Sequence, residues 1–286
     1  MDRRKFITRT AQATALLAVL PNIACANTVV NRGIYTEFGI QLWTLRDIIY
    51  ANPQKTIAEV GKMGFTQIES FEGDKGIFWG MKPTDFKSFL DDEGLKLISS
   101  HCNWQTDLER KADEVASVGG KYLICPWLGP QKSIEDFKTY AEKFNKAGEV
   151  CKKAGIKFAY HNHDYSFKEL EGQIPQQVMM DGTDSDLVDF EMDMYWVVTA
   201  GINPIEYLTK YKNRFKLCHI KDRIKDTKEP FASCTLGEGS IDYTKILKEA
   251  KALNMKYFIY EQEKYDAKGV LFDAEQSAAY LKKMKK

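Results

Sequence analysis

The chain has four histidines, and two of them are only two residues apart, in the segment His161-Asn162-His163. In an extended chain, residues i and i+2 project from the same face, so both imidazoles can act on one bound group. The residues before them, 157–160, are mostly apolar and follow a glycine, as in a buried strand entered from the end of a helix. Two imidazoles at the end of such a strand indicate either a metal site or an acid–base pair.

Polar residues also stand at the ends of other apolar runs. His101 and His219 each follow a short apolar run, as do Glu69 and Glu261. Taken singly, each histidine would be an ordinary core or surface residue. If the runs are parallel strands, however, their carboxyl ends meet at one end of the sheet, which is where such folds place their active sites. The shared position therefore predicts one polar site.

Acidic residues alternate with apolar ones in one of these runs. Asp189, Glu191 and Asp193 are each separated by one apolar residue, so the three carboxylates share a face of the predicted strand. We expect Asp189, Asp222 and Glu263 to be solvated charges at strand ends, because carboxylates are seldom buried.

Eight short apolar runs, each following a helical pattern or the polar start of the chain, indicate the fold. They are residues 38–43, 65–69, 95–99, 122–126, 156–160, 187–192, 215–220 and 257–260. Glycine or asparagine closes most intervening helices, as at Gly64 and Asn254, because both tolerate the left-handed conformation. Alternating strands and helices predict right-handed crossovers and a parallel sheet, and eight units fit a closed (β/α)₈ barrel, a TIM barrel. A doubly wound open sheet is the alternative, but no strand is followed by a glycine-rich dinucleotide-binding turn.

The first 26 residues have the three parts of an export signal. Arg3-Arg4 lies in a basic start, residues 11–20 are mostly apolar, and residues 24–26 form a small-x-small cleavage pattern. This segment resembles a twin-arginine signal, which predicts a periplasmic or otherwise exported protein. The apolar run is too short to remain as a stable membrane anchor.

The rest of the chain then divides into a linker, residues 27–37, and a catalytic barrel domain, residues 38–286. Two other readings of the leader stay open. One is a lipoprotein cleaved before Cys25, and the other is an uncleaved N-terminus in a cytoplasmic protein.

Charge and cysteine content exclude several classes of function. Residues 1–26 hold four basic residues and one acidic residue, so their removal changes the net charge from +1 to about −2. A nearly neutral chain has no electrostatic footprint for nucleic acid. The five cysteines after residue 26 are odd in number and form no CxxC pair, so neither a disulfide framework nor a thiolate zinc site is indicated.

From residue 38 onward the chain resembles the xylose isomerase-like TIM-barrel superfamily, which comprises sugar phosphate isomerases and epimerases and an endonuclease branch. The segments that carry the resemblance are residues 154–163, 193–196, 219–222, 236–239 and 260–263. The resemblance implies a divalent metal held at the ends of strands five to eight, here by His161, Asp193, His219 and Glu261. It also implies a small carbohydrate substrate, and an oligomer is compatible with it.

One of these positions departs from the family pattern. Sugar epimerases have a glutamate where this chain has His161, and they use that glutamate with the last one as an acid–base pair on opposite faces of the sugar. A ligated imidazole offers no free base, so proton transfer falls to Glu261, to His163 or to a metal-bound water. A site with two nitrogen and two carboxylate ligands suits Mn²⁺, Co²⁺, Fe²⁺ or Zn²⁺ better than Mg²⁺. The alternative in which His163 replaces His161 as the ligand stays open.

The expected chemistry is the formation of an enediolate. A metal that polarises a sugar carbonyl acidifies the neighbouring C–H, and Glu261 or His163 takes the proton as the catalytic base. The residues expected to bind substrate are Trp43, Glu69, His101, Trp127, His163, Trp196 and Lys221. The three tryptophans can instead be packing residues between barrel and helices.

The fate of the enediolate defines the enzyme. Our main reading is a metal-dependent sugar isomerase or epimerase. The alternative is a lyase that cleaves 3-keto-glycosides by β-elimination, which the loss of the opposed glutamate and the export signal both favour. A DNA-repair endonuclease would need more metal ligands and a basic groove, and a non-catalytic sugar-binding protein would not need the four-ligand pattern.

Overall fold

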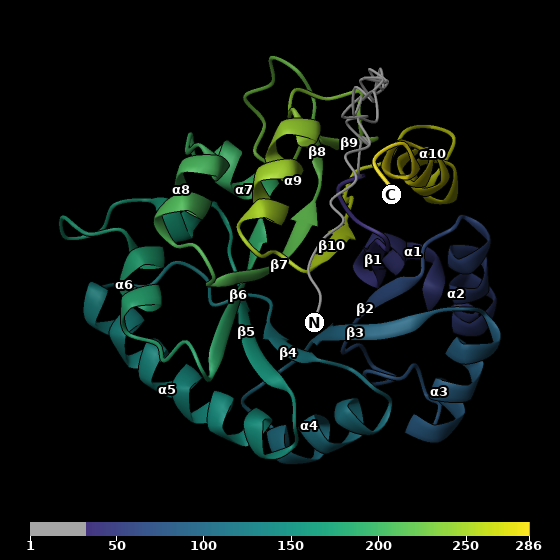
Figure 1. The fold of residues 1–286 in the computed structure, drawn as a ribbon, viewed down its shortest axis with the longest axis horizontal. Helices are drawn as coiled ribbons and strands as arrows, with labels where there is room; N and C mark the ends of the chain where they lie inside the picture. Colours follow the sequence, from purple (N-terminus) through teal and green to yellow (C-terminus); the bar gives the residue numbers. More distant parts are fainter. Residues whose placement is uncertain (1–32, 286) are drawn as a thin grey trace, which may run out of the picture. The chain divides into compact units, whose positions relative to one another are not determined.

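The computed structural model describes residues 33–285, which fold as a closed barrel of parallel strands surrounded by helices (Figure 1). The predicted leader and most of the predicted linker lie outside the described residues. The barrel strands are β1 (Gly39–Gln41), β2 (Gln67–Phe71), β3 (Lys96–His101), β4 (Tyr122–Cys125), β5 (Lys157–His161), β6 (Val188–Asp193), β7 (Phe215–Ile220) and β10 (Tyr257–Tyr260). They pair in the order β1-β10-β7-β6-β5-β4-β3-β2 and close on themselves, so the predicted (β/α)₈ barrel is confirmed.

The helices begin and end at residues whose chemistry explains the boundary. They are α1 (Arg46–Ile49), α2 (Pro53–Lys62), α3 (Pro83–Asp92), α4 (Leu108–Ser117), α5 (Ile134–Lys153), α6 (Pro175–Asp181), α7 (Met194–Thr199), α8 (Pro204–Lys210), α9 (Tyr243–Ala252) and α10 (Val270–Lys282). Four of them start with proline, which needs no N–H partner there. The long helix α5 starts with a capping box between Ser133 and Asp136. Gly64 and Asn254 have positive φ angles after α2 and α9, as predicted.

The observed strands differ from the predicted ones mainly at their ends. The first run is a strand only to Gln41, because the Gln41 side chain accepts the N–H of Trp43 and starts the 3₁₀ helix η1 (Leu42–Leu45). The second strand continues past Glu69 to Phe71. A hairpin that we did not predict, β8 (Asp222–Arg223) and β9 (Ser233–Cys234), lies between β7 and α9. A second 3₁₀ helix, η2 (Asp164–Phe167), follows β5.

The barrel interior has an apolar layer and, nearer the carboxyl ends of the strands, a polar layer. Ile98, Ile124, Ala159, Leu217 and Ile259 are buried together inside the barrel. Two residues further along β5, β7 and β10, the same face carries polar residues, because side chains alternate along a strand. The apolar layer therefore forms the floor beneath the site.

Two carboxylates that we expected to be solvated are buried. Asp189 is 2% exposed, accepts a hydrogen bond from the Tyr122 hydroxyl and pairs with Lys157. Asp222 is 1% exposed and accepts backbone hydrogen bonds from loop residues. The prediction was wrong for both, because each carboxylate has donors that only the fold brings to it. Glu263 is partly exposed, as expected, but it also pairs with Lys221.

None of the described helices is both long and apolar enough to cross a membrane.

Candidate active site

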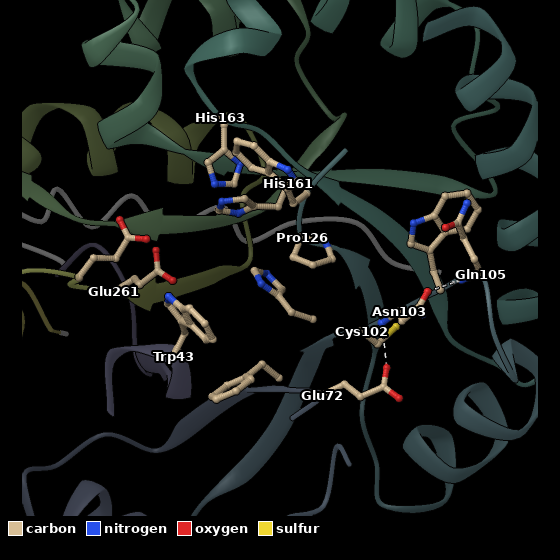
Figure 2. A pocket seen from close by; sticks show the side chains of 14 residues that line it. Trp43, Glu72, Cys102, Asn103, Gln105, Pro126, His161, His163 and Glu261 are labelled. Atoms are coloured by element: carbon tan, nitrogen blue, oxygen red, sulfur yellow. Dashed lines mark hydrogen bonds between the residues drawn. The ribbon is translucent and has the colours of Figure 1, made fainter. Parts of the chain in front are cut away.

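A cavity of about 520 Å³ opens at the carboxyl end of the barrel strands (Figure 2). Its lining comes from segments far apart in the sequence, and its members are Trp43, Phe71, Glu72, His101, Cys102, Asn103, Trp104, Gln105, Pro126, Trp127, His161, His163, Glu261 and Glu263. Of the predicted strand-end residues, His101, His161, His163 and Glu261 therefore line one cavity, as expected for a parallel barrel.

Of the predicted metal ligands, His161 and Glu261 line this cavity, and Asp193 and His219 are buried next to them. Ligand atoms of Asp193, His219 and Glu261 all lie within 4.8 Å of one another. His219 Nδ1 is 3.3 Å from Glu261 Oε2 and 3.8 Å from Asp193 Oδ2. His161 Nε2 lies 3.7 Å from the same oxygen of Asp193. The fourth predicted ligand thus borders the group formed by the other three.

Two further carboxylates lie on the other side of these imidazoles. Glu69 Oε1 is 2.6 Å from His219 Nε2, and Glu191 Oε2 is 3.0 Å from His161 Nδ1. His101 Nε2 lies between the two carboxylates, 3.1 Å from Glu69 and 2.9 Å from Glu191. All five residues are buried. His101, His161, Glu191 and His219 therefore form a second cluster with the composition of a metal site.

The distances between polar atoms differ between the two clusters. Ligand atoms about 2.1 Å from a tetrahedral metal are about 3.4 Å apart, whereas hydrogen-bonded atoms are about 2.6–3.0 Å apart. His219 Nδ1 lies 3.3 Å from Glu261 and 3.8 Å from Asp193, nearer to the first value, whereas Glu69 and Glu191 each lie at hydrogen-bonding distance from one imidazole, at 2.6 and 3.0 Å. Asp193 Oδ2 and His219 Nδ1 are also buried and make no hydrogen bond, although the ammonium group of Lys221 lies 3.0 Å from Asp193 Oδ2. The cluster of Asp193, His219 and Glu261 therefore fits a divalent metal. Glu69 and Glu191 are placed to orient the histidine ligands of that metal.

The ammonium group of Lys221 is the cation nearest the predicted ligands. Its Nζ lies 2.7 Å from Glu261, 3.0 Å from Asp193 and 3.1 Å from Glu263. Burial would lower the pKa of Lys221, but these carboxylates outweigh burial and raise it well above its usual value. Lys221 is 1% exposed and is not among the lining residues, so it neutralises the carboxylates from behind the cavity surface.

The same charges divide the histidines into protonated and neutral ones. Burial lowers the pKa of His219, but Glu191, Glu261 and Glu69 outweigh it and raise the pKa well above the usual value. The pKa of His101 rises to about 9 because Glu69 and Glu191 outweigh the effect of burial. A metal at His219 Nδ1 would have to replace a proton there.

His161 and His163 remain neutral. Burial is the main cause that holds the pKa of each well below the usual value, and neighbouring positive charges add to it. His163 Nδ1 is buried and has no hydrogen-bond partner. Its ring lines the cavity and lies 4.5 Å from the ring of Trp127. His163 thus presents a neutral imidazole ring to the cavity.

The predicted substrate-binding residues divide into two sets. Trp43, His101, Trp127 and His163 line the cavity, and the two tryptophans are 40% and 53% exposed. Glu69, Trp196 and Lys221 are buried and are not among the lining residues. Trp196 packs against His163 and Phe231.

Several polar residues of the site were missing from our predicted set. Glu191 is one, although its alternation with Asp193 already put both carboxylates on one face. Glu72, Trp104 and Gln105 line the cavity from the loops after β2 and β3, where the sequence has no regular pattern to reveal them.

Comparison with known proteins agrees with this geometry. The family model of the xylose isomerase-like TIM barrel matches residues 57–284. An inosose dehydratase of Clostridium perfringens is 32% identical over 194 residues, which span 63% of this chain and 61% of that protein. The chain therefore matches about three-fifths of the length of this curated relative.

Two solved structures have the same fold. A sugar phosphate isomerase/epimerase from Parabacteroides distasonis is 30% identical, with a TM-score of 0.71 over 86% of this chain and 93% of the other. The IOLI protein with a bound zinc atom is 15% identical, with a TM-score of 0.71 over 86% of this chain and 96% of the other. The family match, the closed barrel and the clustered strand-end residues lead to one conclusion: the chain belongs to the xylose isomerase-like TIM-barrel family.

Proposed function

We propose that the protein is a divalent-metal-dependent lyase that acts on a cyclic keto sugar or keto polyol by β-elimination. His161, Asp193, His219 and Glu261 would hold the metal. A bound metal supplies Lewis acidity that polarises the substrate carbonyl and stabilises the enediolate form of the substrate. Two nitrogen and two carboxylate ligands favour Zn²⁺, Mn²⁺, Co²⁺ or Fe²⁺ over Mg²⁺.

The observation that carries this proposal is that a histidine, not a carboxylate, stands at the end of β5, where an acid–base pair across the predicted metal site would need its second carboxylate. At the end of β5 the chain has His161, and the nearest carboxylate there, Glu191, is fully buried behind the imidazole. Glu261 and Glu263 both come from the segment after β10. Epimerisation by proton transfer on two faces needs a base on each, whereas an elimination can proceed from one face.

His163 is the base that the proposal assigns. Burial and neighbouring positive charges lower the pKa of His163, which favours its neutral imidazole, and its ring lines the cavity. Glu261 is a weaker candidate because its carboxylate already accepts a hydrogen bond from Lys221 and is one of the predicted metal ligands. A carboxylate already bound to Lys221 has little tendency to accept a further proton.

The comparisons support elimination more than isomerisation. The curated relative is an inosose dehydratase, whose name describes the loss of water from a cyclic ketone. The leaving group is then either water or, in a 3-keto-glycoside, an alcohol. The zinc atom of the IOLI protein supports a metal in this fold, although at 15% identity it does not identify the metal of this chain.

Isomerisation or epimerisation of a sugar is the second candidate. The structure from Parabacteroides distasonis, a sugar phosphate isomerase/epimerase, favours it. Both candidates begin with removal of a proton next to a carbonyl, so one experiment tests their common step and then separates them by product.

That experiment is deuterium exchange in D₂O, followed by NMR, with metal-loaded protein and with ketoses, inososes and 3-keto-glycosides as substrates. We expect exchange next to the carbonyl, together with an unsaturated keto product. His163→Gln should lower the rate by about 10²–10⁴-fold at unchanged metal content. Chelation or Glu261→Ala should abolish the reaction.

A rearranged sugar without an unsaturated product would move the assignment to isomerase or epimerase. No exchange with any substrate, in protein that holds its metal, would refute the enediolate chemistry itself.

A further inference from the structure

The cavity extends beyond the predicted ligands to a wall formed by Glu72, Asn103, Trp104, Gln105 and Trp127, which we call the outer wall. Figure 2 shows Glu72, Asn103 and Gln105 on the side of the cavity away from Glu261. The cavity volume of about 520 Å³ lies in the range of pockets that hold drug-sized ligands and exceeds what a single sugar ring needs. The outer wall is therefore available to a second part of the substrate.

Glu72 is held in place by a buried cation. Its Oε2 accepts hydrogen bonds of 2.8 Å from Lys111 Nζ and from the backbone N–H of Asn103. Lys111 is 3% exposed and also donates to the Asn103 carbonyl and to Thr106, so it fixes the loop after β3 as well. Both donors bind the same oxygen of Glu72. The other oxygen, Oε1, is left for a hydroxyl donor in the cavity.

Trp127 is an exposed indole on a fixed loop. The Tyr165 hydroxyl accepts the backbone N–H groups of Leu128 and Gly129 at 3.0 and 3.1 Å, and Gln131 donates to the carbonyls of the same two residues. These bonds hold the loop in place before a ligand arrives, so little conformational entropy remains to be lost on binding. A half-exposed tryptophan on a fixed loop is a platform for the apolar face of a sugar ring.

We propose that the outer wall binds a second ring, which is the leaving group of the reaction, so that the substrate is a keto-glycoside rather than a free keto sugar. This inference rests on the proposed elimination. A carboxylate oxygen, two side-chain amides and an aromatic face provide the acceptors, donors and stacking surface that a hydroxylated ring requires. If water were the leaving group, none of these outer-wall groups would be needed.

The chemistry balances with one proton shuttle. His163 takes the proton from the carbon next to the ketone, and the electron pair of that C–H bond forms the C=C bond. The C–O bond at the next carbon breaks with its electron pair on oxygen, and this oxygen takes the proton back from His163. The products are an unsaturated keto sugar and the free alcohol of the second ring. A ring placed on Trp127 lies beside His163, because the two side-chain rings are 4.5 Å apart.

Calorimetric binding of unreactive sugars tests the outer wall independently of catalysis. Metal-loaded protein is titrated with glucose, cellobiose, maltose and trehalose. We expect at least one disaccharide to bind about tenfold more tightly than glucose, which corresponds to about 1.4 kcal/mol. Gln105→Ala and Trp127→Ala should each reduce this ratio severalfold. Gln173→Ala, a substitution of an exposed glutamine outside the cavity lining, should leave it unchanged.

Gln105 is exposed, so its substitution leaves the fold intact, and circular dichroism verifies this for each variant. Equal affinities for glucose and all the disaccharides would overturn the inference. So would a preference that survives both cavity substitutions, or the absence of sugar binding in metal-loaded protein. A disaccharide preference in protein that catalyses no deuterium exchange would keep the outer wall and refute the elimination instead.

Discussion

At the scale of single residues, the imidazoles of His161 and His219 each have one ring nitrogen directed to a carboxylate below and the other to the predicted metal site. The Glu69 carboxylate is hydrogen-bonded to Nε2 of His219, and the Glu191 carboxylate is hydrogen-bonded to Nδ1 of His161. A carboxylate that binds one nitrogen of a histidine ligand fixes the tautomer and the ring orientation, and so presents the other nitrogen to the metal. Burial and Glu69 raise the pKa of Glu191 to about 7, and above this pH its carboxylate is ionised and accepts.

Glu191→Gln is expected to weaken metal binding by about 10–100-fold without abolishing it, because the amide replaces an ionic acceptor beneath His161. The measurement is competition for Zn²⁺ with a chromophoric chelator at constant pH. Asp189→Asn is the matched control, since Asp189 is a buried carboxylate of the same strand that contacts Tyr122 and Lys157 rather than a histidine.

A loss as complete as that in Asp193→Ala would show that Glu191 is itself a ligand. An unchanged affinity would remove Glu191 from the site.

At the scale of elements, the β8–β9 hairpin and the loop after it are organised by one buried carboxylate. Asp222 accepts the backbone N–H groups of Gly237, Gly239 and Ile241, and also that of Arg223. The loop passes so close that a Cβ at Gly239 would overlap the Asp222 carboxylate and the Arg223 carbonyl, so one of these groups would have to move. Asp222 follows Lys221 directly, so this loop supports the segment that carries His219 and Lys221.

Asp222→Ala is expected to lower the free energy of unfolding by about 3 kcal/mol, because it leaves several backbone N–H groups without their charged acceptor. Urea unfolding followed by circular dichroism measures this value. Glu229→Ala, on the exposed part of the same hairpin, should change it by less than about 0.5 kcal/mol. Equal effects of the two substitutions would mean that the loop is held by other contacts.

At the scale of the whole molecule, the barrel brings together charges that are far apart in the chain. Glu69 and His219 are 150 residues apart in sequence and bind each other at 2.6 Å. Lys221 and Glu261 are 40 residues apart, and Lys221 Nζ donates a hydrogen bond of 2.7 Å to Glu261 Oε2. Eight parallel strands place their carboxyl ends around one cavity, so every strand can contribute one group to the chemistry.

Export is also a property of the whole molecule, and we propose it from the leader alone. Replacing Arg3 and Arg4 together by lysine should keep the mature protein in the cytoplasm, because the twin-arginine pathway requires the arginine pair. Cell fractionation followed by immunoblotting measures this, with Lys5→Arg as the control that keeps the basic character of the segment. Periplasmic protein in the double variant would contradict the predicted signal.

The sequence by itself determined the barrel and the gathering of its strand-end residues. Apolar periodicity and helix-terminating residues such as Gly64 and Asn254 are local features, and parallel crossovers then bring the carboxyl ends of all strands together. His161, Asp193, His219 and Glu261 therefore lie near one another, as expected from their positions.

Only the tertiary structure decided which atoms face each other. Glu191 binds His101 and His161 because the stagger of three strands aligns them, and no local pattern encodes that alignment. Asp189 and Asp222 are buried because distant donors compensate them, whereas residue type alone predicts exposure. The outer wall comes from irregular loops whose conformation depends on buried partners such as Lys111. Hydrogen bonds between distant segments form only in the folded chain, so the periodicity of the sequence does not predict them.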